Sequence, residues 1–222
     1  MSYLTPDMAN DAISRMKCFH DDIVSLYGEY GMDLLDNLGR RNIVMSQAQE
    51  KFFAGALAEY YEGVQNDGRT GRADIFIGSL NKELECKLTS KHKSGSISFQ
   101  TDRETLAQKK KLDFLYVIAD PSFSKFAVLH FVGLTTDEFR PVSPGSRGKV
   151  GMYKHKGMKK CNMLHGGAID INERELAKIE KRLAEPFRSD AAQKKVQARK
   201  EYWTTTPTRY SFTLEEVSVP SA

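Results

Sequence analysis

The stretch GRADIFIGSLNKELECKLTS, residues 71–90, decides the fold. Apolar and polar residues alternate on both sides of a Gly-Ser-Leu-Asn cluster, which predicts two strands joined by a tight turn. A hairpin that turns at the centre of this cluster places Asp74 opposite Glu85. Lys87 follows two residues later on the same face, while the apolar residues point the other way into a core. Two acids and one amine therefore share one surface.

The acid pair is unusual for a purely structural hairpin, because like charges directly opposite each other repel. A divalent cation bound between Asp74 and Glu85 would remove that cost. Mg²⁺ prefers carboxylate oxygens and retains waters that contact substrate phosphates. Lys87 beside two acids keeps its positive charge and could stabilise charge that develops on phosphorus. The pattern suits phosphodiester hydrolysis.

A helix is expected to begin at Ser46 as its N-cap, with Phe53 and Leu57 on the buried stripe. Glu50 lies three residues before Phe53 and hence on the same stripe. Two interpretations stay open. Glu50 is a further metal ligand supplied by the helix, or it lies at the edge of the stripe and stabilises the helix N-terminus.

The order of the remaining elements predicts the fold class. The apolar run 114–119 is typical of a central, often parallel, strand that is buried on both faces. A strand at 96–100 and a helix at 103–112 precede it, and a strand at 126–132 follows. We expect an α/β (α+β) fold with a mixed β-sheet flanked by helices.

Further elements are expected outside this core. Thr5 and Pro6 predict a helix start, and residues 32–38 a short second helix. Asn172 and Glu175 form a capping-box pattern for a later helix. A basic helical segment at 193–200 and a terminal strand within 209–219 complete the expected elements.

Composition places limits on the class of protein. The chain has 222 residues, 40% hydrophobic and 28% charged, which predicts one domain, or one domain with appendages, and a full core. We expect no membrane span and no signal peptide, since apolar runs are short and the N-terminus lacks a basic segment. Cys18, Cys86 and Cys161 are odd in number and far apart, which favours reduced thiols in a cytoplasmic protein.

The net charge of +4 is unevenly distributed. Residues 139–169 contain no acid but seven lysines and arginines. A basic stretch of this density usually contacts a polyanion, although a solvated surface loop is the alternative. The candidate DNA-binding residues are Lys91, Lys93, Arg147, Lys149, Lys154, Lys156, Lys159 and Lys160.

Asp74, ten further residues and then Glu85-Cys86-Lys87 resemble the motif of the PD-(D/E)xK nuclease superfamily. The resemblance covers residues 46–132, less than half of the chain. It implies that Asp74 and Glu85 hold the metal, that Lys87 is the catalytic partner, and that Glu50 matches an acid many members carry on the first helix. The chain departs from the pattern in having Ala73 at the proline position and no obvious strand before residue 71.

Within that superfamily, size and layout most resemble a type II restriction endonuclease. The resemblance implies a restriction-endonuclease-like core and one or two Mg²⁺ ions per active site. It also implies double-stranded DNA as partner and a homodimer. In this layout a single domain comprises an N-terminal helical segment (1–43), a catalytic core (about 46–132), and a DNA-recognition insertion with C-terminal helices (139–222).

Other functions are compatible with parts of the sequence. A structure-selective or repair nuclease, such as a Holliday-junction resolvase, would share the chemistry. A non-catalytic DNA-binding protein on the same fold would be expected to have lost an acid or the lysine. A zinc or HNH-type site built from His155, Cys161 and His165 lacks a fourth ligand. A purely structural hairpin is the remaining alternative.

Overall fold

The computed structural model describes residues 2–67, 72–90, 97–142 and 148–217. The chain forms two compact units. The first comprises Met1–Gly167 with Thr213–Ala222, and the second comprises Ala168–Phe212. Within the described ranges, no helix combines the length and the apolar character needed to cross a membrane.

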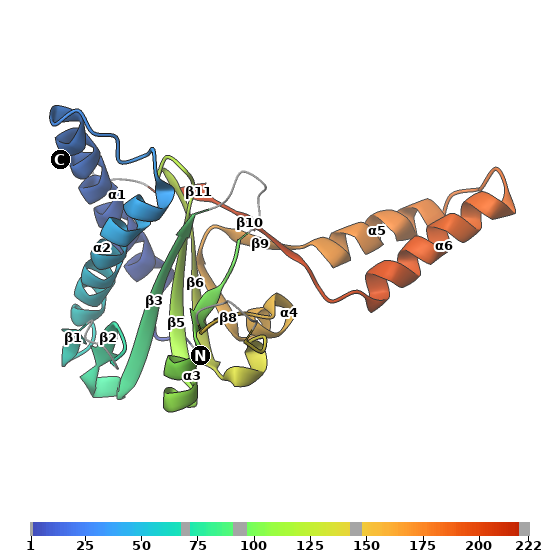
Figure 1. Ribbon diagram of the computed structural model, residues 1–222. Helices are drawn as coiled ribbons and strands as arrows, with labels where there is room; N and C mark the ends of the chain where they lie inside the picture. Colours follow the sequence, from blue (N-terminus) through green and yellow to red (C-terminus); the bar gives the residue numbers. More distant parts are fainter. Residues whose placement is uncertain (1, 68–71, 91–96, 143–147, 218–222) are drawn as a thin grey trace. The chain divides into compact units, whose positions relative to one another are not determined.

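The first unit is built on a mixed sheet with strand order β1-β2-β3-β5-β6-β11, in which β8 also pairs with β6 (Figure 1). β3 and β5 are parallel, and the other pairs in this sheet are antiparallel. The predicted fold class, a mixed sheet flanked by helices, is confirmed. The strands are β1 (Val64–Asn66), β2 (Ile75–Ile77), β3 (Lys82–Ser90), β5 (Leu112–Ala119), β6 (Lys125–Leu134), β8 (Cys161–His165) and β11 (Glu215–Glu216).

The predicted hairpin has the expected register. Ile75 pairs with Leu84 and Ile77 with Lys82, so that extending the ladder by one position brings Asp74 opposite Glu85. The 3-10 helix η1 (Gly78–Leu80) makes the turn, and Asn81 closes it with a positive φ of 49°. All eight residues of β5 are buried, as predicted for a central strand. The parallel crossover from β3 to β5 contains helix α3 (Arg103–Lys109).

The structure supplies the strand that the sequence did not reveal before residue 71. β1 pairs antiparallel with β2, from Val64 opposite Ile77 to Asn66 opposite Ile75. The two segments approach closely here, since the amide of Gly78 donates to the carbonyl of Gly63 at 3.1 Å. Gly63 has φ of 70°, which a side chain would strain. A strand of three residues is too short to show a periodic pattern.

Two long helices, α1 (Pro6–Glu29) and α2 (Leu38–Ala58), cover one face of the sheet (Figure 1). Thr5 caps α1 as predicted, because its hydroxyl accepts from the amide of Met8 at 3.3 Å. Met16 and Phe53 are fully buried in the core between the helices and the sheet. That core also takes Ile75, Ile77, Leu84 and Cys86 from the hairpin.

α2 begins earlier than predicted. Asn37, not Ser46, is its N-cap, and the Asn37 side chain accepts from the amide of Arg40 at 3.1 Å. Ser46 lies inside the helix and donates to the carbonyl of Ile43, a bond typical of serine in mid-helix. The short helix expected at 32–38 is not formed. The expected boundary between an N-terminal segment and the core therefore falls within one continuous helix.

The opposite face of the sheet carries an aromatic cluster of Phe99, Phe114, Tyr116 and Phe131, all buried. A second sheet contributes to this side of the unit, in which β4 (Gln100–Asp102) pairs antiparallel with β7 (Lys149–Gly151). Among its described residues, the basic segment 139–169 forms β7, helix α4 (Lys154–Gly157), the 3-10 helix η3 (Met158–Lys160) and β8. It follows the 3-10 helix η2 (Thr136–Glu138).

The second unit contains α5 (Ile171–Leu183) and α6 (Asp190–Thr205), with β9 (Gly167–Asp170) paired to β10 (Tyr210–Thr213) at its base. The helix at α6 was predicted. Asp170, not Asn172, caps α5. Asn172 is instead buried, and its amide donates to the carbonyls of Trp203 and Thr206, which ties the two helices together.

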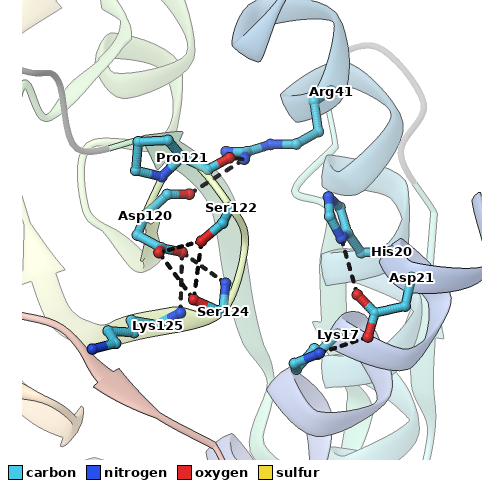
Figure 2. Close-up of polar contacts among 9 residues, drawn as sticks. All are labelled: Lys17, His20, Asp21, Arg41, Asp120, Pro121, Ser122, Ser124 and Lys125. Atoms are coloured by element: carbon cyan, nitrogen blue, oxygen red, sulfur yellow. Dashed lines mark hydrogen bonds and ion pairs between the residues drawn. The ribbon is translucent and has the colours of Figure 1, made fainter. Parts of the chain in front are cut away.

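Arg41 is a fully buried cation that joins α2 to the strand ends. Its guanidinium donates to the carbonyls of Asp120 and Pro121 after β5, and at 2.6 Å to the hydroxyl of Ser90 at the end of β3 (Figure 2 shows the first two). It also lies over the ring of Phe123 at 5.0 Å. Since β3 and β5 are parallel, one side chain holds both of their carboxyl ends.

We expect Arg41→Ala to lower the free energy of unfolding by about 3 kcal/mol or more, because several buried acceptors lose their donor. Arg41→Lys should rescue little, since one ammonium cannot reproduce the planar fork of donors. Urea denaturation measures both changes. The exposed neighbour Arg40 provides the control, and a similar loss in Arg40→Ala would show that the effect is not specific to the buried contacts.

Candidate active site

The hairpin brings Asp74, Glu85 and Lys87 together at the edge of the sheet. Asp74 precedes β2, and its Oδ2 accepts from the amide of Cys86 across the hairpin at 2.7 Å. Lys87 Nζ donates to Glu85 Oε1 at 2.5 Å. Glu85 is buried, whereas Asp74 and Lys87 are half-buried. The predicted cluster of two acids and one amine is therefore formed.

The reason for this placement is the different length of the neighbouring strands. β3 has nine residues, but the described part of β2 pairs only with Lys82, Glu83 and Leu84. β5 pairs with β3 on the other side as far as Ser90. β5 thus holds Glu85 and Lys87 in register, and on the other side of β3 the Asp74 carboxylate accepts from the amide of Cys86.

Glu50 on α2 is a further acid near this cluster. It is half-buried, and its pKa is raised to about 7 by burial, by Asp74 and by Glu85, with Lys87 acting in the opposite direction. The charge of Glu50 is therefore coupled to all three residues of the hairpin cluster. Of the two interpretations left open by the sequence, the structure favours a group that faces the site.

Burial also raises the pKa of both hairpin acids. For Asp74, Lys87 and the Cys86 amide oppose this effect. For Glu85, Lys87 opposes it and Asp74 adds to it. Burial disfavours the ammonium of Lys87, yet Glu85 and Asp74 outweigh that and raise the pKa of Lys87, which stays protonated at neutral pH. The four groups carry a net charge of −2 when all of them are ionised.

Two residues of the site have no signal in the sequence. The fully buried Gln49 donates its amide to the carbonyls of Lys87 at 3.4 Å and Leu115 at 3.2 Å, which attaches α2 to β3 and β5 next to Glu50. Asp102, at the end of β4, is exposed and raises the pKa of Glu85. Neither residue belongs to a motif, so only the pairing of distant strands and helices reveals them.

The donor set fits a hard divalent cation. Asp74 Oδ2 and Glu85 Oε1 take the hydrogen bonds named above, which leaves the second oxygen of each acid for a ligand. A cation there would relieve the repulsion that raises the pKa values of Glu50 and Glu85. Within the described ranges, no three His, Cys, Asp or Glu side chains are grouped closely enough to hold a metal ion as they stand.

A cavity of about 350 Å³ lies beside the hairpin, and its lining includes Ala73, Phe76 and Glu83. Lys109 of α3 lines it and pairs with Glu83 at 2.5 Å.

The candidate DNA-binding residues divide into groups. Lys91, Lys93 and Arg147 lie outside the described residues. Lys149 and Lys159 are exposed, and Lys149 on β7 lies opposite Asp102 of β4, next to the site. The other three have contacts within the protein: Lys156 with the Asp137 carbonyl, Lys154 with the Phe99 ring, and Lys160 with Glu138 at 2.9 Å.

The alternative zinc site has no support in the contacts of its histidines. Both ring nitrogens of His165 are used within the protein, Nδ1 by Asn10 at 2.7 Å and Nε2 by the Glu215 carbonyl at 3.1 Å. His155 is instead near the Tyr153 ring, at 5.7 Å between ring centroids.

No protein-family model, no curated protein sequence and no solved structure matches the chain. The residues themselves therefore carry the functional argument.

We expect Glu50→Gln to stabilise the protein more at pH 8 than at pH 5. The pKa of Glu50, about 7 when folded against an ordinary 4.5, means that the folded state binds more protons between these values. Its contribution to the free energy of unfolding thus falls as pH rises through that window, and glutamine removes this pH dependence. Urea denaturation at both pH values tests it, with the exposed Glu62→Gln as control. Equal stabilisation by Glu50→Gln at both pH values would contradict the raised pKa of Glu50 in the folded protein.

Proposed function

We propose that this protein is a divalent-metal-dependent nuclease that hydrolyses phosphodiester bonds in DNA. The observation that carries the proposal is the pairing of Asp74 and Glu85 across the hairpin, with Lys87 bonded to Glu85 and with Glu50 of α2 near enough for its charge to act on theirs. Their pKa shifts indicate that all four charges interact. Carboxylates that lie close together despite their mutual repulsion, beside a lysine that keeps its charge, are typical of a catalytic site.

Each residue has a role that follows from its environment. Asp74 and Glu85 would hold Mg²⁺, one ion or two with Glu50 as a further ligand. The bound cation supplies an acidified water and neutralises charge at the phosphate. Lys87 remains protonated and stabilises the negative charge that develops on the phosphoryl oxygens. Without a cation the pKa of Glu50 is about 7, so binding of one near Asp74 and Glu85 would favour ionised Glu50, which could then serve as a further ligand.

DNA is the proposed substrate because of the basic segment beside the site. The pairing of Lys149 with Asp102 joins this segment to the strand whose acid acts on Glu85. Sequence-specific cleavage of double-stranded DNA by a homodimer, in a restriction-endonuclease-like core, is the finer form of the proposal. A structure-selective or repair nuclease and a non-catalytic DNA-binding protein are its alternatives.

Incubation with plasmid DNA and Mg²⁺, followed by gel electrophoresis, separates these possibilities. Lys87→Ala should reduce cleavage by about 100-fold or more, because the site loses the ammonium group that stabilises the developing negative charge. DNA binding should be retained. Lys125→Ala, at the far end of β6, is the matched control, and circular dichroism checks that both variants fold.

Discrete bands would support a sequence-specific endonuclease, a smear a nonspecific one, and cutting of branched DNA alone a resolvase. Binding without cleavage of any substrate would favour the non-catalytic alternative. Full activity of Lys87→Ala would refute the site. The mass of the protein in solution tests the homodimer.

The exposed lysines of the basic segment should contact phosphates. We expect the double variant Lys149→Ala/Lys159→Ala to flatten the slope of log affinity against log salt by about 2, or roughly 0.9 for each phosphate that is no longer neutralised. Lys160→Ala should change the slope much less, since Lys160 is already paired with Glu138. Fluorescence anisotropy over a salt series measures the slopes, and an unchanged slope in the double variant would remove β7 and η3 from the DNA interface.

A further inference from the structure

A second cavity, of about 640 Å³, lies beside the candidate active site, between the start of α3, the chain after η2, and β7. Its lining includes three buried apolar side chains, Leu106, Phe139 and Val150, and two exposed arginines, Arg103 and Arg140. The volume is typical of pockets that bind small organic groups. An apolar interior with cationic groups at the opening suits an anion that carries a flat apolar part.

The charges of this cavity favour a negatively charged occupant. The described residues that line it include two guanidinium groups and no carboxylate. Among the described residues, neither Arg103 nor Arg140 has an ion-pair partner. The Arg140 guanidinium instead lies 5.5 Å from the centroid of the Tyr153 ring. Both guanidinium groups keep donors for a phosphate, which arginine binds through its planar fork.

The cavity is next to the acid cluster along the chain and across the sheet. Arg103 directly follows Asp102, whose charge raises the pKa of Glu85. The amide of Arg103 also donates to the carbonyl of Gly148 at 3.0 Å, just before the exposed Lys149 on β7. A DNA strand bound at the acid cluster and at β7 would therefore pass the opening of this cavity.

We propose that the cavity binds one unpaired nucleotide of the DNA strand, next to the phosphate that is cleaved. Its base would pack on Leu106, Phe139 and Val150, and its phosphate would contact Arg103 and Arg140. This inference rests on the proposed function and adds a substrate preference to it. A base in a complete duplex must first be unstacked and unpaired, at a cost of about a few kcal/mol, whereas a bulged base has already met most of that cost. The protein should therefore prefer DNA with a bulged or mismatched nucleotide.

The test compares a labelled duplex with the same duplex carrying a single-nucleotide bulge. Binding is followed by fluorescence anisotropy without any divalent cation. We expect the wild type to bind the bulged duplex about tenfold more tightly, because base contacts of this kind contribute about 1–3 kcal/mol. In Arg103→Ala/Arg140→Ala the affinity for both duplexes falls and the preference disappears. The control Lys149→Ala/Lys159→Ala should weaken both duplexes alike and keep the preference.

A second variant guards against a loss of binding too large to measure. Val142→Asp places an acid at the rim, where Val142 is 37% exposed, without altering the core. It should remove the preference and leave the paired duplex bound with a smaller loss. With 2-aminopurine at the bulge, emission should change on binding to the wild type but not to Val142→Asp.

A wild type without preference, or arginine variants that keep it, would overturn the inference. No cleavage is measured in this assay, so its result is independent of the proposed activity. If the protein prefers the bulged duplex but cuts no DNA, only the proposed nuclease activity is refuted. If the protein cuts DNA but shows no preference for the bulged duplex, only the proposal that the cavity binds a nucleotide is refuted.

Discussion

The unequal pairing of β3 is the constraint on which the candidate site depends. β5 holds β3 in register as far as Ser90, while the described part of β2 stops pairing at Leu84. Beyond Leu84 the Asp74 side chain, not a backbone partner from β2, bonds to the amide of Cys86, which fixes this acid beside Glu85 and Lys87. Gln49 attaches α2 to this strand pair through the carbonyls of Lys87 on β3 and Leu115 on β5, and it thereby places Glu50, the next residue of α2, near the hairpin.

The site is tolerated because the surrounding structure is strong. Three carboxylates share the site with one ammonium, and burial raises the pKa of each acid. Such an arrangement costs stability when it has no cation, which is common at sites selected for function. The apolar packing of α1, α2 and the sheet, and the buried Arg41 at the strand ends, offset that cost.

Much of the site could be predicted from local pattern. Alternation of apolar residues in 71–90 is enough to set the hairpin register, because a shift by one residue would turn Ile75 and Leu84 out of the core. Six of the eight buried residues of β5 were likewise visible as the apolar run 114–119, whereas the buried acid Asp113 hid the start of the strand. The start of α2 was predicted wrongly, because Ser46 has the chemistry of a cap and only its bond to Ile43 shows that it is not one. β1 was missed because three residues carry no period.

The sequence by itself therefore determined which face of the hairpin bears Asp74, Glu85 and Lys87, since side-chain direction in a strand follows from its alternation. The tertiary structure alone decided which distant groups meet them. Glu50 is 24 positions from Asp74, and its role depended on how α2 packs, while Asp102 and Lys149 are joined only through the β4–β7 pairing. Contacts of this kind depend on the closing of the fold around the hairpin, and no local pattern of residues encodes them.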